Sequence, residues 1–65
     1  MIYSKVKVGR IKKKWSQTDL SLQANVCRST ISKIENGYID EIKLGTLKKI
    51  SAALNSSFEE LFLSE

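Results

Sequence analysis

Apolar residues recur at intervals of three and four along most of the 65-residue chain, which is the spacing that places side chains on one face of an α-helix. Leu47, Ile50 and Leu54 give the clearest example, and Phe58 and Phe62 repeat the spacing further along the chain. Strand-like alternation of apolar and polar residues is weak throughout. The pattern therefore predicts an all-α protein.

Turn-forming residues divide the chain into five predicted helices. Their approximate ranges are 5–14, 16–24, 28–36, 44–54 and from Ser56 or Ser57 onward. Asn25, Gly37 and Asn55 each follow a predicted helix, and Gly and Asn readily adopt the left-handed backbone conformation that ends helices. Ser16 and Asp19 form a capping-box pattern that predicts where the second helix begins.

The inward-facing apolar residues of these helices form the predicted core of a single domain, residues 1–65. They are Ile11, Trp15, Leu20, Val26, Ile31, Ile34, Leu47, Ile50, Leu54, Phe58, Leu61 and Phe62. Val8 and Ile11 supply the apolar stripe of the first helix. Trp15 is assigned to the core, rather than to stacking on a base, because of its large apolar area. A chain this short buries only about 60% of its unfolded surface, so its margin of stability is small.

Charge is distributed unevenly along the chain. Residues 1–33 carry eight basic side chains against one acid, a balance of +7, whereas residues 34–65 carry three against six, a balance of −3. A folded molecule with this distribution is expected to present one basic face, which attracts phosphate groups or anionic lipid. A membrane role is not expected, because the lysine-rich first helix has too small an apolar face.

The composition argues against several classes of function. The chain has one Cys and no His, so it lacks the residues for an internal disulfide, a metal cluster or a Ser–His or Cys–His nucleophile. No apolar run reaches the roughly 20 residues that span a bilayer, and no signal peptide is recognisable. We therefore expect a cytoplasmic, nucleoid-associated protein that is not an enzyme and uses no metal or cofactor.

The third predicted helix has two dissimilar faces. Ile31 and Ile34 point to one side of a helical wheel. The opposite side and its flanks carry hydrogen-bonding groups and no acid: Arg28, Ser29, Ser32, Lys33 and Asn36. Only residues 25–27 separate this helix from the second, which is the spacing of a helix-turn-helix. In that motif the second helix enters the major groove of DNA, and the first crosses the phosphate backbone.

The segments "WSQTDLSLQANVCRSTISKIENG" and "TLKKISAALNSSFEELF" resemble the Cro/repressor-type, or XRE-like, helix-turn-helix family. The resemblance covers about residues 5–62 and places the helix-turn-helix at about 17–36. It implies a compact five-helix, lambda-repressor-like DNA-binding domain. The chain departs from the family pattern at Asn25, where Gly is usual, and at Cys27, where Ser or Thr commonly caps the recognition helix. A thiol is a poor cap, and we expect Cys27 to be a small, partly buried filler rather than a redox sensor.

The resemblance also implies roles for individual residues. The base-reading positions are Arg28, Ser29 and Lys33. The positions that contact the DNA backbone are Gln17, Asn36, Arg10 and Lys43, and Gln17 also braces the recognition helix. Arg10 and Glu35 match a pair that forms a buried salt bridge in some repressors.

The expected function is that of a sequence-specific transcriptional regulator that binds double-stranded DNA. A repressor that binds a near-palindromic operator as a homodimer fits best, with half-sites about one helical turn, roughly 34 Å, apart. The predicted dimer interface is the fifth helix with Phe58, Leu61, Phe62 and Leu63, and the alternative is the segment 38–42. A controller of a restriction–modification cassette belongs to the same class. An antitoxin-like module that masks a partner protein is the alternative from another class.

Overall fold

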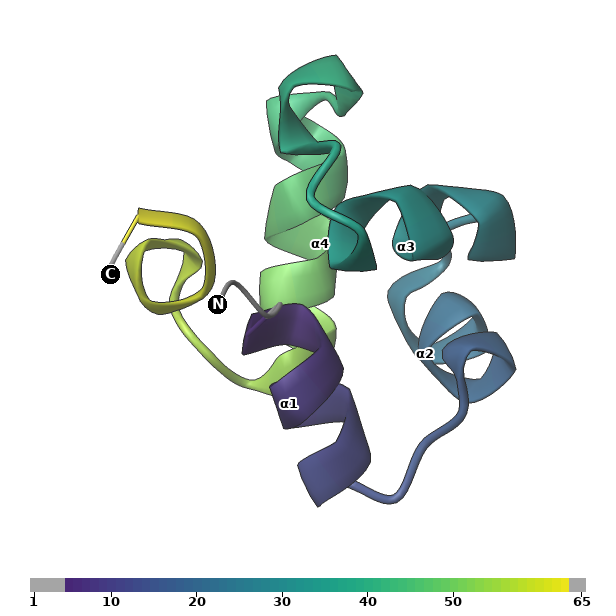
Figure 1. The fold of residues 1–65 in the computed structure, drawn as a ribbon. Coiled ribbons are helices and arrows are strands. Elements are labelled where there is room, and N and C mark those ends of the chain that lie inside the picture. Colours follow the sequence, from purple (N-terminus) through teal and green to yellow (C-terminus); the bar gives the residue numbers. More distant parts are fainter. Residues whose placement is uncertain (1–4, 64–65) are drawn as a thin grey trace.

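The computed structural model of the protein describes residues 5–63, which fold into helices joined by short turns (Figure 1). The elements are α1 (Lys5–Lys12), α2 (Gln17–Ala24), α3 (Arg28–Glu35), the 3₁₀ turn η1 (Ile39–Glu41), α4 (Leu44–Leu54) and the π-helical turn η2 (Glu59–Leu63). The described residues contain no strand, so the prediction of an all-α, five-helix fold is confirmed. The turn η1 was not predicted, and the fifth helix is a single wide turn.

α4 lies against both α1 and α2, and α1 also contacts α3 and η2. In Figure 1, α2 and α3 lie on one side of α1 and α4, whereas η2 lies on the other side. The helix-turn-helix and the C-terminal turn therefore occupy different faces of the molecule.

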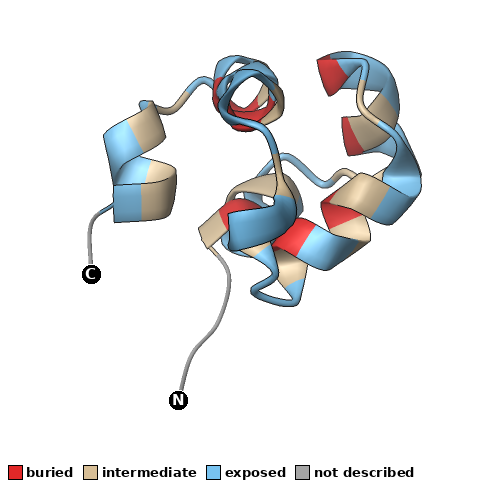
Figure 2. Ribbon diagram, turned by 90° about the horizontal axis from the view of Figure 1, so that it is seen from above, coloured by how far each residue is buried: buried red, intermediate tan, exposed pale blue. Residues whose placement is uncertain are grey.

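The core is a cluster of buried apolar residues from α1 to α4, and Figure 2 marks the buried positions on these helices in red. It contains Val6, Leu20, Ala24, Ile31, Ile34, Leu47, Ile50 and Leu54. Six of these were predicted. Other predicted core residues pack against this cluster but stay partly exposed: Trp15, Val26, Phe58, Leu61 and Phe62.

The prediction for the first helix chose the wrong face. Ile11 is 55% exposed and Val8 is 37% exposed, whereas Val6 is buried. Val6, Gly9 and Arg10 share one side of α1, since Gly9 and Arg10 follow Val6 by three and four positions. That side faces inward: Gly9 lies beside Leu54, whose Cδ1 is 3.6 Å from the position a Cβ would take, and the charge of Arg10 is satisfied inside the fold by Glu35.

Four helix ends are closed by residues in the left-handed conformation: Lys14, Asn25, Gly37 and Asn55. The last three were predicted. α1 instead ends at Lys12, two residues earlier than predicted, because Lys14 has φ 61° and leaves the helical path. The N–H of Lys14 donates to the carbonyl of Ile11 at 2.9 Å, and the N–H of Trp15 donates to that of Arg10 at 3.1 Å. This is the hydrogen-bond pattern of a Schellman motif.

Two helical segments begin with a complete capping box. The hydroxyl of Ser16 accepts from the N–H of Asp19 at 3.0 Å, and the Asp19 carboxylate accepts from the N–H of Ser16 at 2.9 Å. Ser57 and Glu60 make the equivalent pair at 3.1 Å, so the fifth segment begins at Ser57. The backbone hydrogen bond from Ser57 lowers the pKa of Glu60, so this cap stabilises the fold at neutral pH and is lost as the pH falls through that lowered pKa.

α3 and α4 begin without a side-chain cap. Cys27 and Lys43 hold the capping positions, and neither side chain accepts a hydrogen bond from the helix that follows. The prediction that the Cys27 thiol is a poor cap is confirmed. The prediction that it fills a partly buried position is wrong, because the thiol is exposed.

We predict opposite effects on stability from Gly37→Ala and Gly45→Ala. Both positions have room for a methyl group, since, apart from the adjoining backbone, no atom lies within 4 Å of the Cβ that either substitution would add. Gly37 has φ 91°, so alanine there is strained and should lower the free energy of unfolding by about 1 kcal/mol. Gly45 lies inside α4, where alanine should raise it by up to about 1 kcal/mol.

Urea unfolding followed by the fluorescence of the single tryptophan measures both changes. Equal effects of the two substitutions would contradict the left-handed closure of α3.

Candidate nucleic-acid interface

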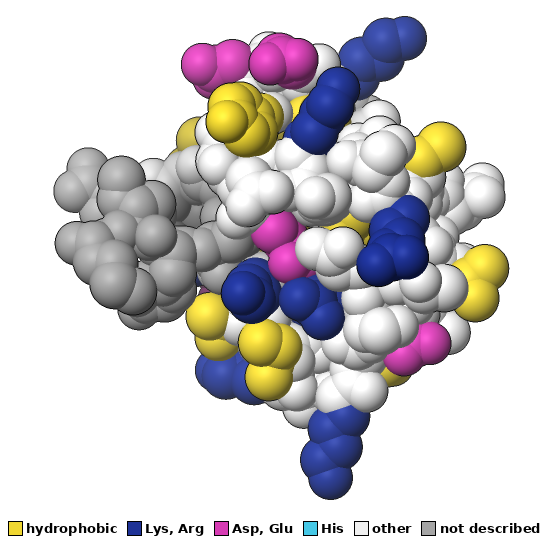
Figure 3. All heavy atoms as spheres, turned by 45° about the vertical axis from the view of Figure 1, so that its right-hand side comes forward, with side chains coloured by type: hydrophobic (Ala, Val, Ile, Leu, Met, Phe, Trp, Pro, Cys, Tyr) yellow, Lys and Arg dark blue, Asp and Glu magenta, His cyan; other side chains and the backbone are white. Residues whose placement is uncertain are grey.

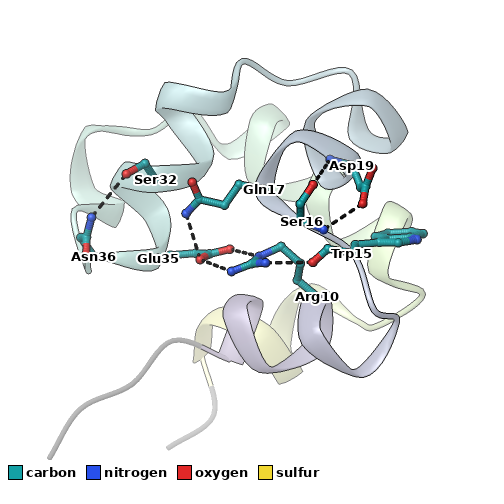
Figure 4. A network of polar contacts seen from close by, with 8 residues as sticks. All are labelled: Arg10, Trp15, Ser16, Gln17, Asp19, Ser32, Glu35 and Asn36. Atoms are coloured by element: carbon teal, nitrogen blue, oxygen red, sulfur yellow. Dashed lines mark hydrogen bonds and ion pairs between the residues drawn. The ribbon is translucent and has the colours of Figure 1, made fainter.

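α3 is anchored on one face and open on the other. Ile31 and Ile34 are fully buried in the core, and the side chain of Glu35 also points inward. The remaining predicted contact residues of this region are exposed: Arg28, Ser29, Lys33 and Asn36. The amide of Asn36 lies 3.5 Å from the hydroxyl of Ser32, a long hydrogen bond along the same helix (Figure 4).

A tight turn sets the angle between α2 and α3. Asn25 adopts φ 56° and ψ 47°, and the N–H of Val26 donates to the carbonyl of Ser21 at 3.1 Å. Val26 then packs against the core and fixes the turn. Asn25 ends α2 in the left-handed conformation that Gly usually supplies at this position. α2 and α3 pack directly against each other, as in a helix-turn-helix.

The carboxylate of Glu35 joins α3 to the two helices before it (Figure 4). Arg10 on α1 donates from Nε to Oε2 at 2.8 Å and from its NH2 nitrogen to Oε1 at 3.1 Å. Gln17, the first residue of α2, donates from Nε2 to Oε1 at 3.2 Å. The other terminal nitrogen of Arg10 donates to the carbonyl of Trp15 at 2.9 Å. We call Arg10, Gln17 and Glu35 the Glu35 network.

The Glu35 network is sheltered from solvent. The side chains of Arg10 and Glu35 are only 11% and 4% exposed. The hydrogen bond to Glu35 raises the pKa of Arg10, against the opposing effect of burial. Most of the Arg10 guanidinium thus faces Glu35 and Trp15 rather than solvent, and Gln17 is partly exposed beside it.

Basic and polar groups dominate the open face around α3. Figure 3 shows Lys and Arg side chains distributed over this face, with a few acids and some hydrophobic side chains between them. Lys43 is exposed at the start of α4, and Lys13 and Lys14 are exposed in the turn between α1 and α2. These lysines belong to the basic face that was expected from the charge distribution. The Trp15 carbonyl was not predicted as an acceptor for Arg10, because only the fold reveals that contact.

The residues predicted for a dimer interface lie at the C-terminal turn. Phe58, Leu61 and Phe62 are partly buried, and the rings of Phe58 and Phe62 are 5.3 Å apart. Leu63 is 64% exposed. These side chains therefore belong partly to the core of one molecule, with Leu63 at the surface.

Among residues 5–63, no helix is long and apolar enough to cross a bilayer. No group of three metal-ligating side chains is present in the same part of the chain.

The fold and the exposed face of α3 define a DNA-binding helix-turn-helix domain. The chain belongs to the helix-turn-helix family HTH_3, whose model matches residues 6–61, and the resemblance to XRE-like regulators is confirmed. Among solved structures, it is similar to a hypothetical transcription factor, NHTF, from Neisseria, with 31% sequence identity and a TM-score of 0.78. The match covers 89% of this chain and 66% of that one. No curated protein matches the sequence.

The network predicts strong energetic coupling between Arg10 and Glu35. Because both side chains are largely shielded from solvent, Arg10→Met or Glu35→Leu alone should lower the free energy of unfolding by about 3 kcal/mol, since each leaves a shielded charge without its partner. The double variant should lose far less free energy of unfolding than the two single variants lose together, because an apolar pair of similar volume replaces the ion pair.

Urea unfolding of the four proteins, each carrying Gly45→Ala to keep the single variants folded, measures this coupling. Additive effects would show that the ion pair does not connect the two helices energetically.

Proposed function

We propose that this protein is a sequence-specific regulator of transcription that inserts α3 into the major groove of double-stranded DNA. The observation that carries the proposal is the charge arrangement of α3. The helix contains one acid, Glu35, and that carboxylate is buried on Arg10. The exposed face therefore presents Arg28 and Lys33 with no negative side chain of the same helix to repel phosphate.

Three side chains of α3 are proposed to read bases. Arg28 and Ser29 lie in its first turn, and helix-turn-helix proteins contact base edges with the N-terminal residues of this helix. Arg28 and Lys33 suit the O6 and N7 acceptors of guanine, and a hydroxyl such as that of Ser29 accepts or donates. All three are exposed, as base contact requires.

Gln17, Asn36 and Lys43 are proposed to bind the phosphate backbone. Gln17 uses one amide hydrogen for Glu35, which leaves the second for a phosphate. Asn36 and Lys43 are exposed on either side of η1. Arg10 acts mainly through Glu35, because its guanidinium is almost fully covered, and it contributes little direct contact with DNA.

We further propose that the regulator is a homodimer that represses from a near-palindromic operator. The molecule measures 25 × 23 × 20 Å, so half-sites roughly 34 Å apart leave room for two copies on one duplex. The exposed Leu63 and the partly buried Phe58, Leu61 and Phe62 offer an apolar contact on a face away from α3. Occupation of a promoter by such a dimer excludes polymerase.

The proposal predicts distinct effects of Lys33→Ala and Gln17→Ala on DNA binding. The wild-type protein is first used to select its site from a pool of random duplexes, and affinities are then measured by gel-shift titration. Lys33→Ala should relax the preference at one base position by about 1–3 kcal/mol. Gln17→Ala should weaken all sequences similarly, because phosphate contacts carry no sequence information.

The proposal is wrong if the wild-type protein selects no common sequence and its affinity falls equally with salt for all duplexes. The protein would then bind DNA only through its basic charge. That result would favour the antitoxin-like alternative. If Lys33→Ala leaves the preference unchanged, the assignment of Lys33 to a base is wrong.

The dimer is tested with Leu63→Ser, which removes an exposed apolar side chain from the proposed interface. Loss of the burial of one leucine in each copy should raise the dimer dissociation constant about tenfold or more. Leu22→Ser is the matched control, because Leu22 is 74% exposed on α2. Sedimentation equilibrium at micromolar concentration measures both. A wild-type protein that stays monomeric even on its selected duplex would contradict the dimer.

A further inference from the structure

Lys14 has a backbone conformation that suits its residue type poorly. Its φ is 61°, and the other described residues with positive φ are Asn25, Gly37 and Asn55. Glycine has no Cβ to clash, and the short side chain of Asn bonds locally, whereas lysine has neither advantage. The Schellman hydrogen bonds of α1 nevertheless hold Lys14 in this conformation.

Packing inside the molecule does not explain why lysine occupies this position. The side chain of Lys14 is exposed, and it makes no hydrogen bond or ion pair with the described residues. The neighbouring lysines are placed differently. Lys12 and Lys13 line the groove between α1 and the C-terminal segment, and the Lys13 ammonium also lies 5.3 Å from the centre of the Trp15 ring. Lys14 is therefore the member of the run with an unfavourable backbone and no internal contact.

Lys14 lies close to the proposed phosphate contact of α2. Gln17 follows Lys14 by three positions, so the two Cα atoms are at most about 11 Å apart. The Glu35 network fixes Gln17, and the hydrogen bond from Arg10 to the Trp15 carbonyl fixes the segment between them. A phosphate held by Gln17 thus has its neighbour on the same strand within reach of a lysine side chain.

We infer that Lys14 binds the DNA phosphate next to the one contacted by Gln17 and so extends the footprint beyond the helix-turn-helix. This inference rests on the proposed DNA-binding function. A strained backbone position with an exposed charge is explained when that charge acts on a ligand rather than on the fold. The contact adds affinity for every sequence and leaves the base preference to α3.

The test is Lys14→Gly, which should change stability and DNA binding in opposite directions. Glycine relieves the positive φ, so the melting temperature should rise by roughly 2–6 °C. Affinity for the selected duplex should fall roughly tenfold at 0.1 M salt, and the slope of log K against log salt should shrink by about 0.9 for each Lys14 in the complex. The loss should be equal for specific and random duplexes.

Two controls separate this effect from strain relief and from net charge. Asn55→Gly changes another left-handed position, at the end of α4, and should leave DNA binding unchanged. Lys12→Gln removes one charge from the same run, but at a side chain that lines the groove beside η2, and should cost less than threefold in affinity.

The inference is overturned if Lys14→Gly binds with wild-type affinity and salt slope, or loses no more affinity than Lys12→Gln. Either result leaves the proposed function intact, because the wild-type protein still selects its sequence. The proposed function is tested separately, with the wild-type protein alone. It fails if that protein selects no sequence.

Discussion

The arrangement of the first three helices depends on one buried carboxylate. Glu35 accepts hydrogen bonds from Arg10 on α1 and from Gln17 at the start of α2, while its own helix α3 is held by Ile31 and Ile34. Desolvation of two charges costs free energy that their attraction only partly returns, so such a pair contributes less to net stability than its short distance suggests. It is, however, intolerant of misplacement, since any shift of α1 relative to α3 separates buried charges.

The same carboxylate also determines the electrostatics of the exposed face. An acid at the end of α3 would oppose phosphate if it faced outward, but the pairing with Arg10 turns it inward and neutralises it. The burial of Arg10 at the same time withdraws a cation from the surface. The charge of the open face is therefore carried by side chains on α3 and on the turns around it, which are exposed without internal ion pairs among the described residues. They include Arg28, Lys33 and Lys14.

The sequence predicted those parts of the structure that depend on local chemistry. The periodic residues of α3 and α4, the capping box of Ser16 and the turn at Asn25 all follow from neighbours within a few positions. The inward face of α1 did not follow, because it is formed by Val6, Gly9 and Arg10. A glycine and an arginine give no apolar pattern from which a buried face could be predicted. Their inward position depends on Leu54 and the Glu35 carboxylate, which are distant in the sequence and lie opposite them in the fold. The exposed face of α3 was predictable because it is the complement of its buried isoleucines.

Helix capping is distributed unevenly among the helices. α2 and the C-terminal turn begin with capping boxes, whereas α3 and α4 begin at Cys27 and Lys43 without a side-chain acceptor. A missing cap typically costs about 1 kcal/mol, which is a large fraction of the stability of a chain this short. The first N–H groups of α3 therefore remain available to water or to DNA instead of being satisfied within the protein. The segment proposed to enter the groove is thus held by its buried face and by Glu35, rather than by its own first turn.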